Sequence, residues 1–307
     1  MLYCGHGDDR LVLSPSAIEA YINCPYLWFV SQRLRPTTFD ETLGPLEQGT
    51  FVHAVWEQFY QELNQQLGLR RVTPDTVSQA QDLLDQVFDE CLHKQESLDG
   101  IRYVPRTEIE KTDAQRLKEI LKDNLVEQAS FLPSFVPMGA ELALAPQQNI
   151  EYAGVVIRGR VDRVDVNDEL GHYVVVDYKG SIAGHDAGCQ DYDTLVLPHK
   201  VQALIYAQVL RHQFESYRPV GALYLSYKAR DARSLVAGSF SESLFEVSQY
   251  AKNASKVCGN FEEYLDRIES IIEQRLLFLR QGFIEPDPLG VDSCRYCPVR
   301  ECARRLS

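Results

Sequence analysis

The sequence lacks the long apolar runs that membrane-spanning helices need. No hydrophobic stretch approaches the ~18 residues that predict a membrane span. The opening residues, MLYCGHGDDR, also lack the basic segment and the following apolar segment of a secretory signal. We therefore expect a cytoplasmic protein that does not associate with membranes.

Positive charge is scarce as well. The chain has 31 Lys and Arg residues against 44 Asp and Glu residues, which gives a formal net charge of −13. This balance excludes a surface that is basic all round, so any nucleic acid has to bind in a local groove or with the help of a partner. A Walker A phosphate-binding pattern is also absent, and we expect neither ATP hydrolysis nor a nucleotide cofactor.

No internal repeat, low-complexity tract or clear domain boundary interrupts the 307 residues, and 45% of them are hydrophobic, enough for a large core. The periodicity of apolar residues predicts a single domain, residues 1–307, in which helices flank a mixed sheet and residues 65–135 form a helical insertion. The expected helices cover 13–30, 49–63, 73–92, 107–132, 197–214 and 261–283, and the expected strands cover 140–150, 155–166, 173–179 and 220–228. The acidic residues of the third helix are most simply a solvated face.

The eight cysteines are unevenly distributed. Four of them stand alone, namely Cys4, Cys91, Cys189 and Cys258. Three are crowded into the segment CRYCPVREC near the C-terminus, at positions 294, 297 and 302. Because no export signal supports a disulfide framework, this crowding predicts ligands to a metal ion or a metal cluster.

A pair of opposite charges ends a strongly apolar strand in the segment VVVDYKG, residues 174–180. The β-branched valines suit a strand buried on both faces, and side chains two positions apart point to the same side. Asp177 and Lys179 therefore share one face. Since removing two charges from water is costly, they form either a structural ion pair or half of a functional site.

The preceding segment, VVIRGRVDRVDV at 155–166, favours the functional interpretation. It predicts a neighbouring strand, joined to the first by a turn at 167–172, and this hairpin would bring Asp162 near Asp177. Two carboxylates with backbone oxygens suit magnesium, and Lys179 could then orient a water molecule or stabilise charge on a phosphate. The alternative is that Asp162 is a turn residue bonded to its own backbone.

Six short motifs occur in a recognisable order along the chain. They are Cys24-Pro25 in an opening helix, Gly49 to His53, Gly159 to Asp162, Asp177 to Lys179, Gln202 to Tyr206, and the closing cysteines Cys294, Cys297 and Cys302. Each motif alone is weak, but together they resemble the RecB-like PD-(D/E)XK nuclease family with an iron–sulfur cluster. The most similar members are the C-terminal nuclease domain of AddB and the CRISPR-associated exonucleases.

The resemblance implies roles for individual residues. His53, Asp162, Asp177 and the backbone carbonyl of Tyr178 would hold Mg²⁺ or Mn²⁺, and Lys179 would assist the nucleophilic water. Glu141 would support the site, unless it is a surface carboxylate, and Gln202 with Tyr206 would contact DNA or support the site, unless they only pack. A lone histidine on an amphipathic helix is often a core residue, which is the alternative for His53.

The resemblance also implies a [4Fe–4S] cluster, with Cys24, Cys294, Cys297 and Cys302 as its ligands. The cluster would staple the first helix to the C-terminal region, residues 286–307, although the last gap is one residue shorter than expected. Four thiolates could instead bind zinc. Four arginines lie among these cysteines and suit either a DNA strand or the negative charge of a cluster: Arg295, Arg300, Arg304 and Arg305.

The implied fold is a restriction-endonuclease-like mixed sheet flanked by helices, with the helical insertion and the iron–sulfur staple. The implied activity is phosphodiester hydrolysis in single-stranded or end-containing DNA by a metal-dependent deoxyribonuclease, most simply an exonuclease. It would act in recombination or repair, alone or as the nuclease domain of a helicase–nuclease, with a helicase or a CRISPR-adaptation protein as partner. The alternatives are a non-catalytic iron–sulfur DNA-binding or scaffold module of the same fold and a redox protein.

Overall fold

The computed structural model describes most of the chain. It covers residues 11–34, 44–96, 103–144, 150–183, 185, 197–244, 247, 253–257, 259–295 and 297–306. Three of the isolated cysteines, Cys4, Cys189 and Cys258, lie outside the described residues. The same holds for part of the expected strand 140–150 and part of the expected insertion.

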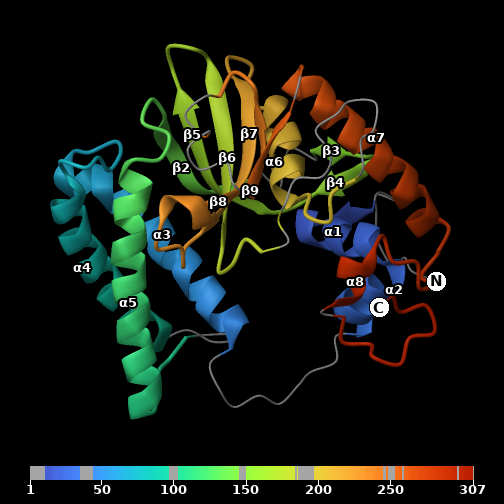
Figure 1. The fold of residues 1–307 in the computed structure, drawn as a ribbon, viewed down its shortest axis with the longest axis horizontal. Coiled ribbons are helices and arrows are strands. Elements are labelled where there is room, and N and C mark those ends of the chain that lie inside the picture. The colour runs from blue at the N-terminus through green and yellow to red at the C-terminus, as the bar shows by residue number, and fades with distance from the viewer. Residues whose placement is uncertain are drawn as a thin grey trace.

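A six-stranded mixed sheet forms the centre of the molecule, in the order β2-β5-β6-β7-β8-β9 (Figure 1). The strands β2, β5 and β6 pair antiparallel, whereas β6 and β7 are parallel. The bounds are β2 Val136–Ala143, β5 Arg160–Asn167, β6 His172–Lys179, β7 Arg218–Ser226, β8 Val236–Ser241 and β9 Asn253–Val257. The mixed sheet and the β5–β6 hairpin confirm the sequence-based predictions.

Helices cover both faces of this sheet (Figure 1). On one face lie α1 Pro15–Asn23, α6 Gln202–Arg211 and α7 Phe261–Arg280, and on the other lie α3 Pro45–Leu67, α4 Val77–Glu96 and α5 Glu108–Ala129. Strand β6 shows why two layers form: Tyr173 and Val175 join the first core, while Val174 and Val176 join the second. None of the helices in the described ranges is both long and apolar enough to cross a membrane.

A small sheet and two short helices complete the first layer. A small sheet has the order β1-β4-β3, formed by β1 Val12–Leu13, β3 Glu151–Tyr152 and β4 Val155–Ile157. The short helices α2 Pro25–Trp28 and α8 Val291–Arg295 lie beside each other in Figure 1, close to α1. The N-terminal helices and the C-terminal segment are therefore neighbours, although they lie at opposite ends of the sequence.

Several predicted bounds were wrong. The single strand expected over 155–166 is two strands in different sheets, and the chain crosses between them at Gly159, where an added Cβ would lie 3.0 Å from the Tyr206 hydroxyl. The helix expected over 13–30 breaks at Cys24, which is extended because Pro25 follows it. The helix expected over 197–214 is shorter, since it begins only at Gln202 and ends at Arg211.

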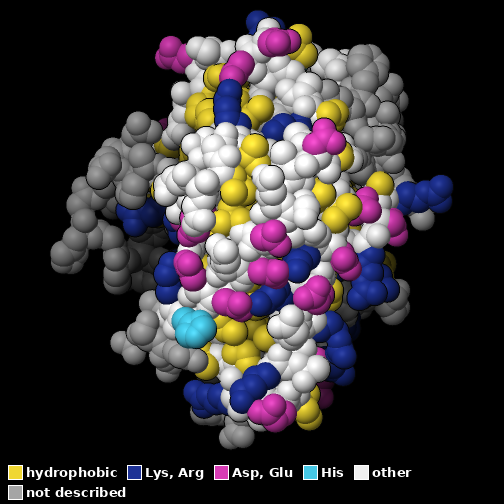
Figure 2. Space-filling model, turned by 90° about the vertical axis from the view of Figure 1, so that its left-hand side faces the viewer, with side chains coloured by type: hydrophobic (Ala, Val, Ile, Leu, Met, Phe, Trp, Pro, Cys, Tyr) yellow, Lys and Arg dark blue, Asp and Glu magenta, His cyan; other side chains and the backbone are white. Residues whose placement is uncertain are grey.

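The acidic side chains of α4 form part of a mixed surface. Asp89 and Asp85 pair with lysines of α5, with Lys118 Nζ 2.6 Å from Asp89 and Lys122 Nζ 2.8 Å from Asp85. On the face shown in Figure 2, basic and acidic side chains lie among one another. The sequence predicted a solvated face, but Asp85 and Asp89 pair with lysines of α5, and the side chain of Lys118 is only 11% exposed, so part of this acidic face packs against α5.

Candidate active site

Two carboxylates meet where β5 begins and β6 ends. The register pairs Arg163 with Val176, so the next pair along is Asp162 and Asp177, which are 7% and 1% exposed. The Asp162 Oδ2 atom accepts a hydrogen bond of 2.7 Å from the backbone N–H of Tyr178 on the neighbouring strand. Asp162 is therefore held across the hairpin, and the alternative that it bonds only to its own turn is not needed.

Lys179 lies on the same side of β6 as Asp177. Its Nζ atom is 2.5 Å from Asp177 Oδ2 and donates a hydrogen bond of 3.2 Å to Gln202 Oε1 on α6. The ammonium also lies 5.9 Å from the centre of the Tyr224 ring on β7. The lysine is thus positioned from three elements, and about a quarter of its side chain (26%) remains exposed.

His53 approaches the two carboxylates from α3, which belongs to the helical layer on the other side of the sheet from α6. Its Nδ1 atom lies 3.2 Å from Asp162 Oδ1, and 28% of its side chain is exposed. Its ring meets the edge of the Tyr178 ring at 6.3 Å between centroids. A partly exposed histidine that faces a carboxylate differs from a core histidine, so the structure favours the functional interpretation of His53.

The other sequence-predicted residues lie around this group. Tyr206 is 4% exposed within the core beneath α6, where its hydroxyl approaches Gly159. Glu141 occupies the β2 position across from Asp162, because its neighbours Ala140 and Leu142 pair with Arg163 and Val161. The side chain of Glu141 is outside the described part of the structure.

Burial and neighbouring charges set the pKa values of Asp177 and Lys179. Burial raises the pKa of Asp177 to about 7, and repulsion from Asp162 adds to the shift, while Lys179 and His53 oppose it. For Lys179, burial lowers the pKa, but the Asp177 and Asp162 carboxylates outweigh it and the net pKa is raised. Lys179 therefore remains a cation at neutral pH, beside a carboxyl group that does not ionise easily without further positive charge.

The residues present fit a divalent cation. Asp177 is buried, and apart from its ion pair with Lys179 its carboxylate oxygens have no hydrogen-bond partner among the described residues. Two carboxylates, one imidazole and a backbone carbonyl are oxygen-rich donors of the kind that magnesium and manganese take. As the side chains stand in the described ranges, no group of three His, Cys, Asp or Glu residues is arranged to hold a metal ion. The fit therefore rests on the donor set and on the buried carboxylate that lacks hydrogen bonds.

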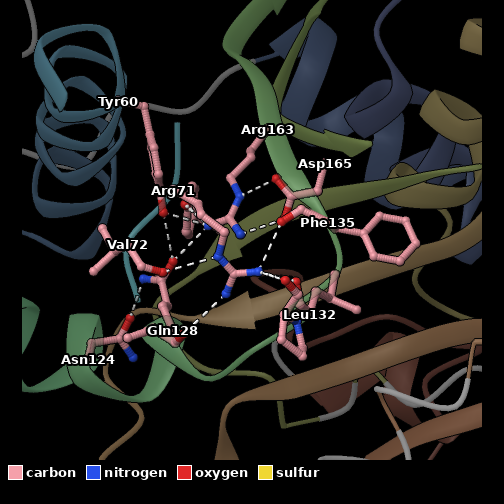
Figure 3. A network of polar contacts seen from close by, with 12 residues as sticks. Tyr60, Arg71, Val72, Asn124, Gln128, Leu132, Phe135, Arg163 and Asp165 are labelled. Carbon is pink, nitrogen blue, oxygen red and sulfur yellow. Dashed lines mark hydrogen bonds and ion pairs between the residues drawn. The ribbon is translucent and has the colours of Figure 1, made fainter. Parts of the chain in front are cut away.

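A polar network on the opposite side of β5 fixes α3 against the sheet (Figure 3). The buried Arg163 guanidinium forms two hydrogen bonds with Asp165, of 2.7 and 2.5 Å. It also donates 2.7 Å hydrogen bonds to the Tyr60 hydroxyl and to Gln128 Oε1. Since Tyr60 lies two turns after His53 on the same helix, this network holds the helix that presents His53 to the carboxylates.

Four cysteines line one hollow between the chain ends: Cys24, Cys294, Cys297 and Cys302. All four are free thiols. The backbone N–H of Leu289 donates to the carbonyl of Asn23, next to Cys24, at 2.8 Å, and the N–H of Leu306 lies 3.4 Å from Cys294 Sγ. Four thiols that line one hollow are the donor set of a four-thiolate metal ion or cluster, although the side chains of the described ranges are not arranged to hold one as they stand.

Basic residues continue from this hollow. Arg295, Arg300 and Arg305 line a second hollow together with Cys297. Arg295 and Cys297 also line a cavity of about 490 Å³ that extends to Lys200 and Glu19. The second hollow and the cavity share Arg295 and Cys297, and the two together are here called the C-terminal groove.

Sequence reasoning missed two groups near the site. Glu19 on α1 contacts the start of α6, and its position one turn before Asn23 and Cys24 was the signal available. His185 is 9% exposed and lies 4.8 Å from the Tyr224 ring between centroids. Burial, with a smaller effect of Lys200, lowers the pKa of His185 to about 4, so this histidine is neutral at physiological pH.

Known proteins are similar to this sequence over nearly its whole length. The chain is 26% identical over 334 residues to an ATP-dependent helicase/deoxyribonuclease subunit of Lactococcus lactis subsp. lactis, an alignment that covers 96% of this chain and 29% of that protein. It is 25% identical to the exonuclease/helicase subunit RexB of Lactococcus lactis subsp. cremoris, with the same coverage of 96% and 29%.

A third similar protein is an ATP-dependent helicase/deoxyribonuclease subunit of Alkaliphilus oremlandii, which is 30% identical over 69% of this chain and 19% of its own length. The chain thus spans less than a third of the length of these curated relatives. Residues 12–302 match the sequence profile of the PD-(D/E)XK nuclease superfamily, which confirms the family that the six motifs indicated. The chain belongs to the PD-(D/E)XK nuclease superfamily.

Proposed function

We propose that the chain is a metal-dependent deoxyribonuclease domain that hydrolyses phosphodiester bonds, as the nuclease part of a helicase–nuclease. The observation that carries the proposal is the group of Asp162, Lys179 and His53 around the buried Asp177 carboxylate. Family membership and the names of the relatives, which contain "deoxyribonuclease" and "exonuclease", support it. Exonuclease action on single-stranded or end-containing DNA is the form we propose.

Four groups would hold Mg²⁺ or Mn²⁺ in this scheme: His53, Asp162, Asp177 and the backbone carbonyl of Tyr178. When bound, such an ion supplies positive charge that stabilises the phosphate as it becomes more negative. Lys179 keeps its proton and directs its N–H groups toward the scissile phosphate and the attacking water. Gln202 holds the lysine in that direction, and Glu141 supports the site from β2.

The cysteine hollow has a structural role in this proposal. Cys24, Cys294, Cys297 and Cys302 would bind a [4Fe–4S] cluster that fastens residues 286–307 to the first helices. The whole chain would then act as one nuclease domain, with residues 65–135 as a helical insertion. Iron analysis would distinguish this cluster from a zinc ion bound in the same four-thiolate site.

DNA would follow the C-terminal groove, because this is where basic side chains gather in an otherwise acidic protein. Arg295 and Arg300 are exposed there and can contact phosphates without base specificity. Any ATP-driven unwinding would come from a helicase partner or from another part of a longer protein, since the chain carries no Walker A pattern.

The test is cleavage of end-labelled single-stranded DNA by anaerobically purified protein, with Mg²⁺, Mn²⁺ or a chelator. We expect metal-dependent cleavage by the wild type and none by Asp177→Asn. Asp168→Asn is the matched control, because Asp168 lies in the β5–β6 turn, is 55% exposed and contacts Arg70 and Tyr217, away from the carboxylate pair. Cleavage by Asp177→Asn at the wild-type rate, or cleavage that persists in chelator, would overturn the proposal.

A further inference from the structure

Glu19 joins the first helix to the start of α6. Its Oε2 atom accepts hydrogen bonds from the backbone N–H groups of Val201, at 2.9 Å, and Gln202, at 3.3 Å. Its Oε1 atom lies 2.9 Å from Lys200 Nζ, and only 13% of the Glu19 side chain is exposed. The carboxylate is thus fixed against a segment 182 residues away in the sequence.

The backbone N–H groups at the N-terminus of α6 have no hydrogen-bond acceptor within the helix itself. The first N–H groups of any helix lack partners within it, and a polar side chain at the N-cap position usually accepts from them. The N-cap of α6 is Val201, which has no side-chain acceptor. Glu19 supplies the missing acceptor, and the Tyr224 hydroxyl accepts from the next N–H, that of Ala203, at 3.2 Å. A carboxylate at this end of a helix is also favoured by the helix dipole.

The first residue of α6 is the one that touches the proposed catalytic lysine. Gln202 donates a hydrogen bond to Glu19 through its backbone N–H and accepts another from Lys179 through its side chain. Lys179 in turn contacts Asp177. The positions of these groups therefore depend on one another, in the order Glu19, Gln202, Lys179.

The C-terminal end of the helix that carries Glu19 is also fixed. The Asn23 side-chain amide, one turn later, donates to the carbonyls of Glu19 and His199 at 2.8 and 2.7 Å. Asn23 Oδ1 lies 2.6 Å from His199 Nδ1, and the hydroxyl of Ser293 approaches the same pair at 3.3 Å. These contacts fix α1 to the segment before α6 and to α8, so the backbone of Glu19 is held in place.

We infer that Glu19 is a positioning residue for the proposed reaction: it fixes the first turn of α6 and thereby the Gln202 side chain that directs Lys179. The inference rests on the proposed nuclease function. Without an acceptor at the α6 N-terminus, Gln202 shifts and its side chain no longer holds the Lys179 ammonium from the α6 side. A displacement of about 1 Å in such a group can reduce a rate by up to about 10²-fold.

The side-chain length of Glu19 is the property to vary. Glu19→Gln keeps an oxygen at the same reach for Val201 and Gln202, so we expect kcat within about threefold of the wild type. Glu19→Asp keeps the charge but is one methylene too short, so kcat falls by about tenfold or more. Because Glu19 also lines the cavity of the proposed DNA path and pairs with Lys200, the KM for single-stranded DNA is measured beside kcat, and a loss confined to KM would overturn the inference.

A matched control separates positioning from general stability. Glu269 on α7 is also a half-buried carboxylate that accepts a backbone hydrogen bond, of 2.9 Å from Ala153, and it bonds Gln208 at 2.7 Å. Glu269→Asp lowers the melting temperature but leaves kcat near the wild-type value. Glu19→Asp adds little further loss when it is combined with Gln202→Ala, since both changes act through the same side chain.

The outcomes are distinct. Three results would each overturn the inference while the nuclease function stands. They are a wild-type kcat in folded Glu19→Asp, an equal loss of kcat in Glu19→Asp and Glu269→Asp, and fully additive losses when Glu19→Asp is combined with Gln202→Ala. If Glu19→Asp does not fold, a loss of kcat in folded Glu19→Gln as large as that in Gln202→Ala overturns it, and retained kcat supports it. A wild-type protein that does not cleave DNA would overturn the proposed function and this inference together.

Discussion

Lys179 and Asp177 lie side by side on one face of β6, with the ammonium 2.5 Å from a carboxylate oxygen that has little access to solvent. A second carboxylate, Asp162, faces them across the hairpin. The single positive charge of Lys179 cannot balance both carboxylates, so the Lys179–Asp177 pair alone leaves one negative charge uncompensated. This imbalance distinguishes the group from a structural ion pair.

The two members of this pair should differ in their effect on stability. Lys179→Ala leaves two buried carboxylates facing each other, so we expect it to abolish cleavage and to lower the free energy of unfolding by about 2 kcal/mol, less than for a fully buried pair. Asp177→Asn also abolishes cleavage but removes the repulsion, so stability stays within about 1 kcal/mol of the wild type. Chemical denaturation without metal checks both values. Equal destabilisation by the two variants would contradict this account of the charges.

His53→Ala should weaken metal binding and cleavage together. The imidazole lies 3.2 Å from Asp162 and supplies the nitrogen donor of the proposed site. We expect a higher Mn²⁺ concentration for half-maximal cleavage and a weaker Mn²⁺ affinity by calorimetry, with the folded state preserved because the ring is partly exposed. Loss of folding with unchanged Mn²⁺ affinity would instead support the core-histidine interpretation.

The four cysteines of the hollow should behave as a set. Replacing Cys24, Cys294, Cys297 or Cys302 with serine should remove iron, remove absorbance near about 400 nm, and destabilise the fold, because metal-binding energy contributes to folding. Cys91 is the control: it is 4% exposed, and burial raises the pKa of its thiol to about 11, so it is unreactive. Cys91→Ala should keep the iron and cost about 1 kcal/mol. Zinc in place of iron in anaerobic protein would refute the cluster but retain the site.

The lowered pKa of His185 predicts that the protein loses stability in mild acid. Its pKa is lowered to about 4 in the folded protein, whereas an exposed histidine titrates near 6.5. The unfolded chain therefore binds a proton between these values and the folded chain does not, so the stability present above pH 6.5 is lost as the pH falls toward 4. The difference amounts to about 3 kcal/mol. His185→Gln should flatten the stability profile across this interval, which denaturation at a series of pH values measures.

The features that could be predicted from the sequence are those that depend on residues close together in the chain. The polar turn at 167–172 joins β5 to β6 in the expected hairpin. Asp162 came close to Asp177 for the same reason, since a hairpin register follows from its turn. The two-residue spacing of Asp177 and Lys179 on an apolar strand was enough to predict that the two charges share one face.

The sequence could not predict contacts that depend on distant segments. The break at Gly159 follows from the approach of Tyr206, and no local pattern marks it. The role of Glu19 depends on Val201 lacking a polar side chain, which matters only once α1 lies beside α6. The buried Arg163 network draws on α3 and α5 as well as β5, and the arginine alone would have suggested a surface residue.

DNA affinity should depend on salt through the C-terminal groove. Each phosphate contact contributes roughly −0.7 to the slope of log affinity against log salt for a single strand. The double variant Arg295→Ala, Arg300→Ala should therefore flatten this slope by about 1 at unchanged iron content. Arg116→Ala is the control, because Arg116 lies on α5, is 67% exposed and pairs with Asp113, away from the groove. If the double variant loses iron or stability with its slope preserved, the two arginines balance the charge of the cysteine site, and DNA contacts the other end of the groove, at Lys200 beside Gln202.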